Sequence, residues 1–302
     1  MAARIWLCWL PCGLAKIGWP LGWPTSLEFL SKGSDAEFFE FVNPLADMTE
    51  LSYTATWGTY YKPSAQNQSV EGWRRMWPEA NPVEGGMRAL TFVQERSGRG
   101  VVVFRGTDLD SSGTSGQADA CANAELAHAP LPGYCNQFTS FQLDYVSRAL
   151  DIARKAAEVH PTVEWLYTGH SLGAELANVV GAVRGAAVLG FAAPAVLPVL
   201  RDRTAVDPHQ LPFWKSLSLY NELDPLRFQA LGQLPGANCS WVNQPDVPSC
   251  DVCELHGKID EGSPECKQCF YKTHILKSYL ALLRSGQRPV CPDAELGDYL
   301  VV

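Results

Sequence analysis

Residues 169–173, Gly169-His170-Ser171-Leu172-Gly173, determine the fold that this sequence predicts. They follow a short aromatic and apolar run at 163–168, which is typical of a buried strand. Apolar residues then recur at three- and four-residue steps and predict one face of a helix: Leu172, Leu176, Val179, Val180 and Val183. A GxSxG pattern between a strand and a helix is typical of a nucleophile elbow, a sharp turn that exposes a reactive serine.

Ser171 is therefore the candidate nucleophile. Gly169 and Gly173 lack a Cβ atom, so the chain can turn sharply on either side of it. The hydroxyl would lie at the positive end of the following helix, where developing negative charge is stabilised. The alternative is a glycine-lined turn in which the serine only caps the helix.

Composition excludes one class of partner. The chain has 302 residues, of which 46% are hydrophobic, enough for a large core in one α/β domain or in two smaller ones. Its formal net charge is -8, and it has no dense run of Lys and Arg. We therefore expect no nucleic-acid partner.

The first residues resemble a compact secretory signal, with one positive charge and a short apolar run. The run is too short and too interrupted by Pro and Lys for a transmembrane helix. Residues 1–24 are expected to be a signal peptide, with a tryptophan-rich interfacial anchor or an imperfect gene start as alternatives. Removing them leaves a single domain at 25–302.

Cysteine usage indicates the compartment. The chain has ten cysteines, and loss of Cys8 and Cys12 with the signal would leave eight. An even number of this size is typical of a disulfide-bonded secreted protein. We expect the protein to be secreted or to reside in the lumen of the secretory pathway.

Expected strands and helices alternate along the chain. Helices are expected at 45–57, 138–159 and 273–283, and strands at 163–168, 187–192, 214–220 and twice within 87–107. The continuous apolar run at 101–104 predicts a central strand covered on both faces. Residues 108–132 are expected to form a long loop or lid, and 236–271 a Cys-rich insertion before the final helix. This order predicts an α/β fold with a mostly parallel sheet and helices on both faces.

A serine nucleophile needs a histidine base and a carboxylate that orients the base. In folds with this elbow the chain order is Ser, Asp or Glu, then His. Asp224 follows the expected strand at 214–220, where side chains reach the carboxyl edge of the sheet. Of the histidines after Ser171, His274 precedes the last helix, and His256 is the rival base within the insertion. The alternatives are a turn residue before Pro225 for Asp224 and a surface histidine for His274.

Acyl transfer also needs donors for the oxyanion. The backbone N–H of Leu172, directly after the nucleophile, is one candidate. Thr107 is the second, through its N–H, its hydroxyl or both, because Gly106 allows close approach after the strand at 101–104. The alternative is that Gly106 and Thr107 merely end that strand.

With these motifs, the chain resembles the class 3 lipase family, the fungal-type lipase-like α/β-hydrolases. The matching segments are FRGTD at 104–108, TGHSLG at 168–173, NELDPL at 221–226 and His274 followed by a Tyr. The resemblance implies an α/β-hydrolase fold, with Ser171 as nucleophile, His274 as base and then acid, and Asp224 orienting it. It also implies oxyanion donors at Thr107 and Leu172 and neither metal nor organic cofactor.

Three features depart from the family pattern. Ala174 and Glu175 follow Gly173 where Gly and Ala are common, which places a carboxyl group one turn from the nucleophile. The Tyr after His274 is farther along than usual. Residues 108–135, where these lipases carry a lid, show no evident amphipathic helix.

Four cysteines in the insertion form two CxxC pairs: Cys250, Cys253, Cys266 and Cys269. Their spacing is close to that of a zinc site. We favour disulfides, because the secretory signal and the even cysteine count indicate an oxidising compartment.

The expected function is a serine carboxylic-ester hydrolase, a triacylglycerol lipase or another acyl-lipid hydrolase that contacts a lipid interface. Phospholipase A1, galactolipase and feruloyl esterase activities on the same scaffold are alternatives. A non-catalytic lipase-like binding or signalling protein is the competing class, because a fold does not guarantee an activity. The sequence names no protein partner.

Overall fold

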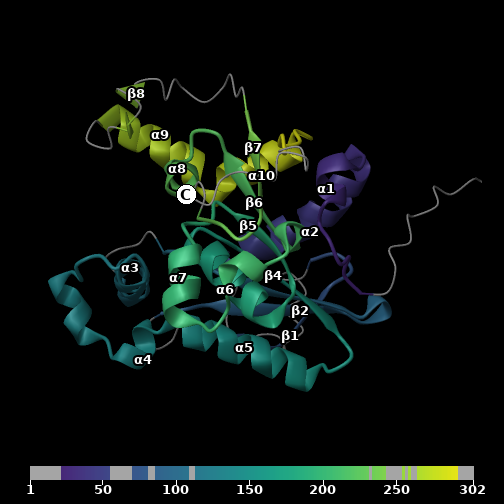
Figure 1. The fold of residues 1–302 in the computed structure, drawn as a ribbon, viewed down its shortest axis with the longest axis horizontal. Helices are drawn as coiled ribbons and strands as arrows, with labels where there is room; N and C mark the ends of the chain where they lie inside the picture. Colours follow the sequence, from purple (N-terminus) through teal and green to yellow (C-terminus); the bar gives the residue numbers. More distant parts are fainter. Residues whose placement is uncertain are drawn as a thin grey trace, which may run out of the picture.

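The computed structural model describes residues 22–54, 70–80, 86–108, 113–230, 233–242, 254–255, 258–259 and 264–291. Within them, seven strands form one sheet in the spatial order of the chain (Figure 1): β1 (Arg74–Ala80), β2 (Ala89–Gln94), β3 (Arg99–Phe104), β4 (Glu164–His170), β5 (Ala187–Phe191), β6 (Ser216–Asn221) and β7 (Ala237–Trp241). The pairs β1–β2 and β2–β3 are antiparallel, and every pair from β3 to β7 is parallel. A separate hairpin pairs β8 (Glu254–Leu255) with β9 (Lys258–Ile259).

Helices cover both faces of this sheet. The helices of the described residues are α1 (Phe29–Lys32), α2 (Asp35–Thr54), α3 (Thr114–Leu126), α4 (Ser140–Leu143), α5 (Tyr145–Val159), α6 (Leu172–Arg184), α7 (Leu197–Arg203), α8 (Pro225–Ala230), α9 (Pro264–His274) and α10 (Leu276–Arg284). Short 3-10 turns lie at Glu95–Ser97, Gly133–Gln137, Pro208–Gln210 and Phe213–Lys215. Because the parallel strands progress in one direction, right-handed crossovers place their connecting helices on one face. There α5 packs on α6, while α2 and α10 pack together on the opposite face (Figure 1).

The alternation of β3 shows how the core is divided. Val101 and Val103 join the cluster beneath α2 and α10, whereas Val102 and Phe104 join the cluster beneath α5 and α6. Every residue of β3 is buried. Both faces of β3 are therefore covered, which confirms the prediction of a central strand. A strand covered on both faces needs apolar side chains on both, which explains its continuous apolar run.

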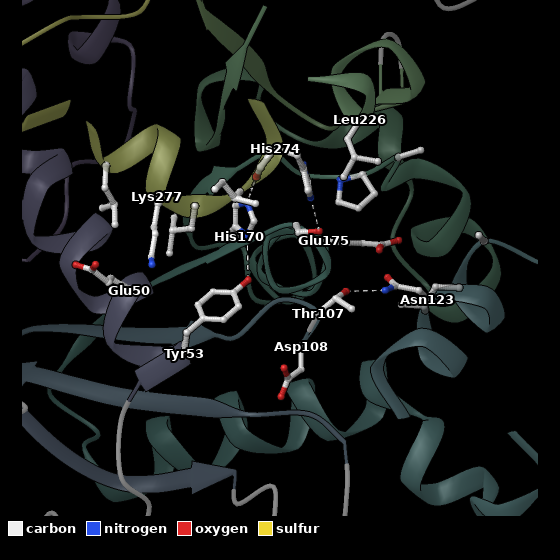
Figure 2. A pocket seen from close by; sticks show the side chains of 18 of the residues that line it. Glu50, Tyr53, Thr107, Asp108, Asn123, His170, Glu175, Leu226, His274 and Lys277 are labelled. Atoms are coloured by element: carbon white, nitrogen blue, oxygen red, sulfur yellow. Dashed lines mark hydrogen bonds between the residues drawn. The ribbon is translucent and has the colours of Figure 1, made fainter. Parts of the chain in front are cut away.

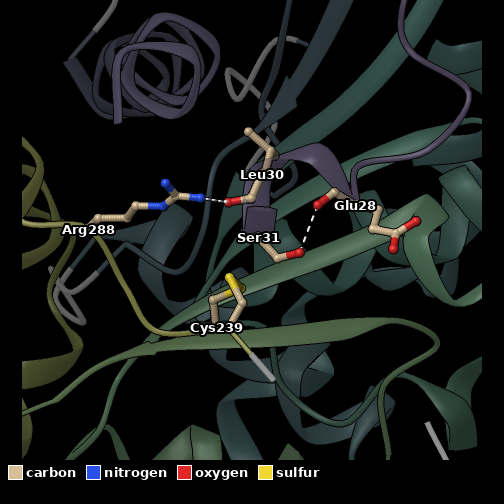
Figure 3. Close-up of a disulfide and its surroundings, with 6 residues drawn as sticks. Glu28, Leu30, Ser31, Cys239 and Arg288 are labelled. Carbon is tan, nitrogen blue, oxygen red and sulfur yellow. Dashed lines mark hydrogen bonds between the residues drawn. A yellow bond between two sulfur atoms is a disulfide. The ribbon is translucent and has the colours of Figure 1, made fainter. Parts of the chain in front are cut away.

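The last described residues are tied to the sheet and to α1. A disulfide joins Cys239 on β7 to Cys291 beyond α10, and a second joins Cys121 to Cys135. Near the first, Arg288 donates to the carbonyl oxygen of Leu30 at 2.6 Å (Figure 3). The segment after α10 is thereby fixed against α1.

Several predicted boundaries differ in the structure. Helix α2 begins at Asp35, not at residue 45, and Pro44 lies inside it. Buried side chains at helical spacing before residue 45 explain the longer helix: Phe38, Phe41 and Val42. The helix expected at 138–159 is divided into α4 and α5 at Asp144, which caps α5, and Phe141 on α4 is 72% exposed.

The segment at 108–132 is not a long loop, because residues 114–126 form helix α3. Its buried side includes small residues and a paired carboxyl, Gly116, Ala118, Asp119, Cys121 and Ala122, so it carries no apolar period. The expected insertion at 236–271 begins later than predicted, because residues 237–241 form β7 of the main sheet. The final helix α10 begins at Leu276 rather than at residue 273.

The observed layers confirm the predicted α/β-hydrolase fold, with its mostly parallel sheet and helices on both faces. None of the described helices is long and apolar enough to cross a membrane.

Candidate active site

Ser171 lies in a strained turn between β4 and α6. Its backbone has φ 57° and ψ -130°, a conformation that residues with a Cβ rarely adopt. The turn is held by a hydrogen bond from the Ser171 N–H to the Phe191 carbonyl oxygen at 2.9 Å. Ser171 occupies the N-cap position of α6, but its side chain makes no capping hydrogen bond, so the hydroxyl is available for other partners.

Close packing explains the two glycines of the motif. A Cβ on Gly173 would lie 2.3 Å from the carbonyl oxygen of Phe104, and one on Gly169 would lie 2.5 Å from the carbonyl group of Gly173. Neither glycine has a positive φ. The motif therefore requires glycine for close approach of β3, β4 and α6, whereas the unusual backbone conformation lies at the serine.

The structure brings Ser171, His274 and Asp224 together from three parts of the fold. Figure 2 labels His274 among the side chains that line the pocket. Ser171 follows β4, Asp224 follows β6, and His274 ends α9. Nε2 of His274 lies 3.0 Å from Oγ of Ser171, and its Nδ1 lies 2.9 Å from Oδ2 of Asp224. Because a carboxylate only accepts hydrogen bonds, this arrangement places the ring proton on Nδ1 and leaves Nε2 to accept from the hydroxyl.

Asp224 is fully buried and held from two further sides. The backbone N–H of Leu226 donates to its Oδ1 at 2.9 Å, and the hydroxyl of Tyr279 on α10 donates to its Oδ2 at 2.5 Å. The same hydroxyl accepts from the N–H of Asn221 at 3.1 Å. The carboxylate therefore has a fixed orientation toward His274.

A second hydrogen-bonded chain supports the backbone of His274. Nε2 of His170 lies 2.6 Å from the carbonyl oxygen of His274, and its Nδ1 lies 2.9 Å from the hydroxyl oxygen of Tyr53. Nε2 must donate to the carbonyl, so Nδ1 accepts from Tyr53. Burial lowers the pKa of His170 to about 3, which keeps the ring neutral in this role.

Thr107 lines the same cavity as Ser171, directly after β3. The side-chain amide of Asn123 on α3 donates to its hydroxyl oxygen at 2.7 Å (Figure 2). The hydroxyl hydrogen of Thr107 is left to donate elsewhere. Leu172 is the first residue of α6, where backbone N–H groups have no partner within the helix.

A buried ion pair fixes the turn that carries Thr107. Arg105 pairs with Asp119 on α3, and the side chains of both are almost fully buried. Asp119 also accepts from the N–H of Asp108 at 2.8 Å and from the hydroxyl of Tyr145 at 2.6 Å. Burial raises the pKa of Asp119 to about 6, although Arg105 opposes this shift. Helix α3 is thus fastened to the loop after β3 and to α5.

The cavity above Ser171 has a volume of about 1000 Å³. Figure 2 shows two sides of it, one with Glu50, Tyr53 and Lys277 and the other with Asn123 and Leu226. Its size is at the upper end of the range for small-molecule sites, which are mostly apolar with a few polar groups.

Glu175 also lines this cavity, one turn beyond Ser171 on α6. Its side chain is almost completely buried, and burial raises its pKa to about 8. Burial is the cause of this shift, so ionisation of Glu175 is suppressed at neutral pH.

The remaining candidate residues have different outcomes. Cys269 is disulfide-bonded and so has no thiolate for zinc, in agreement with the disulfide interpretation. Cys250, Cys253 and His256 lie outside the described residues, and the side chain of Cys266 is not described. Among the described side chains, no cluster of three or more His, Cys, Asp or Glu residues could hold a metal ion.

Sequence reasoning missed the residues that support this site. Tyr53 and Asn123 carry no motif, because each acts through a contact made only in the folded chain. His170 lies within the elbow motif itself, but its contact with His274 spans 104 residues of sequence. Tyr279 is the Tyr noted beyond His274, and its later position is accommodated because α10 begins only at Leu276.

Comparisons with known proteins gave matches among solved structures. Neither a scan against models of protein families nor a search of curated proteins gave a match. The chain is similar to the LIP2 lipase of Yarrowia lipolytica, with 17% identity and a TM-score of 0.42 over 69% of this chain and 81% of that one. It is also similar to a lipase of Rhizopus microsporus var. chinensis, with 12% identity and a TM-score of 0.44 over 89% and 96% of the two chains. A third similar structure is lipase II of Rhizopus niveus, with 14% identity and a TM-score of 0.41 over 69% of this chain and 82% of that one.

Proposed function

We propose that this protein is a serine carboxylic-ester hydrolase that acts on acyl lipids. The observation that carries the proposal is the hydrogen-bonded series from Ser171 through His274 to Asp224, at the wall of a cavity of about 1000 Å³. A hydroxyl becomes a nucleophile when an adjacent base takes its proton and a third group orients that base. Ser171 meets these conditions and lies half-buried in a strained turn at the cavity wall.

The proposed reaction has two halves. Oγ of Ser171 attacks the ester carbonyl carbon while its proton passes to Nε2 of His274, and the alcohol then leaves with that proton. Water repeats the sequence on the acyl-enzyme. Its proton goes to Nε2, its hydroxyl joins the acyl carbon, and the proton returns to Oγ as the acid is released. Asp224 holds the ring in the required tautomer and stabilises it when it is charged.

The oxyanion that forms on the carbonyl oxygen needs donors already in place. We assign this role to the N–H of Leu172 at the start of α6 and to Thr107. Asn123 supports the assignment, because its donation to Thr107 directs the threonine hydroxyl hydrogen away from α3. In this proposal no step needs a metal or organic cofactor.

We further propose an oxidising compartment and contact with a lipid interface. The disulfides Cys121–Cys135 and Cys239–Cys291 are typical of secreted proteins. Leu131, Tyr134 and Phe141 lie exposed in the connection between α3 and α5, next to the helix that lines the cavity. Exposed apolar side chains of this kind suit contact with a lipid surface.

The test is hydrolysis of an acyl ester series of increasing chain length by the purified protein and by the Ser171→Ala variant. We expect turnover of long-chain esters that the variant loses while it keeps its circular dichroism spectrum. If the folded wild-type protein hydrolyses no ester, the non-catalytic binding function replaces the proposal.

A further inference from the structure

Glu175 is a buried acidic group in the wall of the cavity. It lies on the first turn of α6, and its N–H donates to the carbonyl oxygen of Ser171 at 3.1 Å. Ser171 and Glu175 both line the cavity, so the two side chains face the same space. Figure 2 shows the carboxyl group on the side of the cavity that holds Asn123 and Leu226, away from Glu50 and Lys277.

The other acidic groups nearby have cationic partners, whereas Glu175 has none. Asp119 and Asp108 both pair with Arg105. Glu175 is 4% exposed, and within the described part of the chain no group donates a hydrogen bond to its carboxyl or pairs with it. A buried polar group without a partner destabilises a fold, and an apolar residue of similar size would avoid that cost.

Burial also determines which form of the group a ligand would meet. With its pKa raised to about 8, Glu175 is a neutral carboxylic acid at pH 7. A neutral carboxylic acid carries one O–H donor, in contrast to the acceptor-only carboxylate. Of the donors on this side of the cavity, Asn123 donates to Thr107, and the Thr107 hydroxyl is assigned to the oxyanion, so Glu175 offers a further donor to a ligand oxygen.

We infer that Glu175 is a specificity-determining residue that donates a hydrogen bond to an oxygen substituent of the substrate. The inference rests on the proposed ester hydrolysis and deepens it by naming the substrate class: esters that carry a hydroxyl, keto or ether oxygen near the scissile bond. Glu175 lies four residues beyond Ser171, about 6 Å along the helix axis. The oxygen therefore lies within a few bonds of the carbonyl carbon, on either the acyl or the alcohol part.

Two matched substrate sets test the inference. In one set a hydroxyl group is moved along the acyl chain, and in the other it is moved along the alcohol. Each ester has a control with a methyl group in place of the hydroxyl, so that size is constant. The readout is the ratio of kcat/KM for the hydroxyl ester to that for its methyl control, which gives each enzyme variant its own reference.

For the wild-type protein we expect one position, in one of the two sets, at which the ratio is about tenfold to a hundredfold higher than at the others, the effect of one hydrogen bond in a buried site. Glu175→Gln, which keeps a neutral donor of the same shape, should retain this preference. Glu175→Ala should lose it, and Glu175→Met serves as a second apolar variant that fills the space if alanine impairs folding.

Each other outcome overturns a specific claim. A flat ratio at every position in the wild type, or a preference retained by both apolar variants, refutes the role of Glu175 and leaves ester hydrolysis standing. A preference for esters with a cationic ammonium substituent refutes the neutral donor. Absence of all ester turnover in the folded wild-type protein refutes the proposed function and this inference with it.

Discussion

The isosteric substitution Glu175→Gln should make the protein more stable, and increasingly so as the pH rises. Burial raises the pKa of Glu175 from its usual value of 4.5 to about 8, with no cation to oppose it. Between these two values the native state keeps the proton, whereas the unfolded chain releases it. The unfolded state is therefore favoured progressively as the pH increases, and this loss of stability ends once the native carboxyl also ionises.

The magnitude follows from the size of the pKa shift. Each pKa unit corresponds to about 1.4 kcal/mol, so the full difference is about 5 kcal/mol in the free energy of unfolding. Relative to the glutamine variant, the wild-type protein should lose about 1 kcal/mol by pH 5 and nearly the whole amount by about pH 9. The near-complete burial of Glu175 justifies using the shift without a correction for solvent screening.

Urea unfolding of both proteins at a series of pH values measures this difference. Other titrating groups, such as Asp119 and His170, are common to both proteins and cancel in the comparison. A constant effect of the amide itself would shift all points equally. If the difference between the two proteins does not change with pH, Glu175 ionises normally and the argument for a neutral carboxylic acid in the cavity is wrong.

Three further predictions concern the supports of the site. Thr107→Val removes a proposed oxyanion donor and should lower kcat about a hundredfold, and steady-state kinetics with unchanged kcat would contradict that role. Tyr279→Phe removes the hydroxyl that holds Asp224 and should lower kcat about tenfold with little change in KM, whereas a normal kcat would show that Asp224 keeps its orientation without it. Replacing Cys121 and Cys135 together by Ser should lower the free energy of unfolding by about 3 kcal/mol, and an unshifted urea midpoint would refute a stabilising disulfide.

Local patterns were enough to predict the centre of the fold. The apolar run at 101–104 and the elbow at 169–173 each specify a strand or turn through residues adjacent in sequence, and both are found as β3 and the β4–α6 turn. The order of strands and helices then restricts the sheet to a mostly parallel arrangement. The proximity of Asp224 to Ser171 could be inferred, because parallel strands carry their following residues to one edge, and His274 was indicated by the chain order Ser, Asp, His.

Features that depend on tertiary contacts were not predictable. Helix α3 shows no apolar period, since its buried side is mostly made of small residues and of Asp119, whose charge is balanced by Arg105 in the loop after β3. Strand β7 was not recognised within the Cys-rich segment, because its place in the main sheet depends on pairing with β6. Likewise, the sequence placed a carboxyl group at Glu175, but only the fold shows it to be buried in the cavity without a cation.

In the proposed mechanism Ser171 is the nucleophile that forms the acyl-enzyme. Mass spectrometry of the protein after treatment with a serine-directed organophosphate, alongside the rate of ester hydrolysis, tests this role. We expect one covalent adduct on the peptide that contains Ser171, loss of hydrolysis in proportion to labelling, and neither adduct nor hydrolysis in Ser171→Ala. Labelling or hydrolysis that persists in the folded Ser171→Ala variant would contradict it.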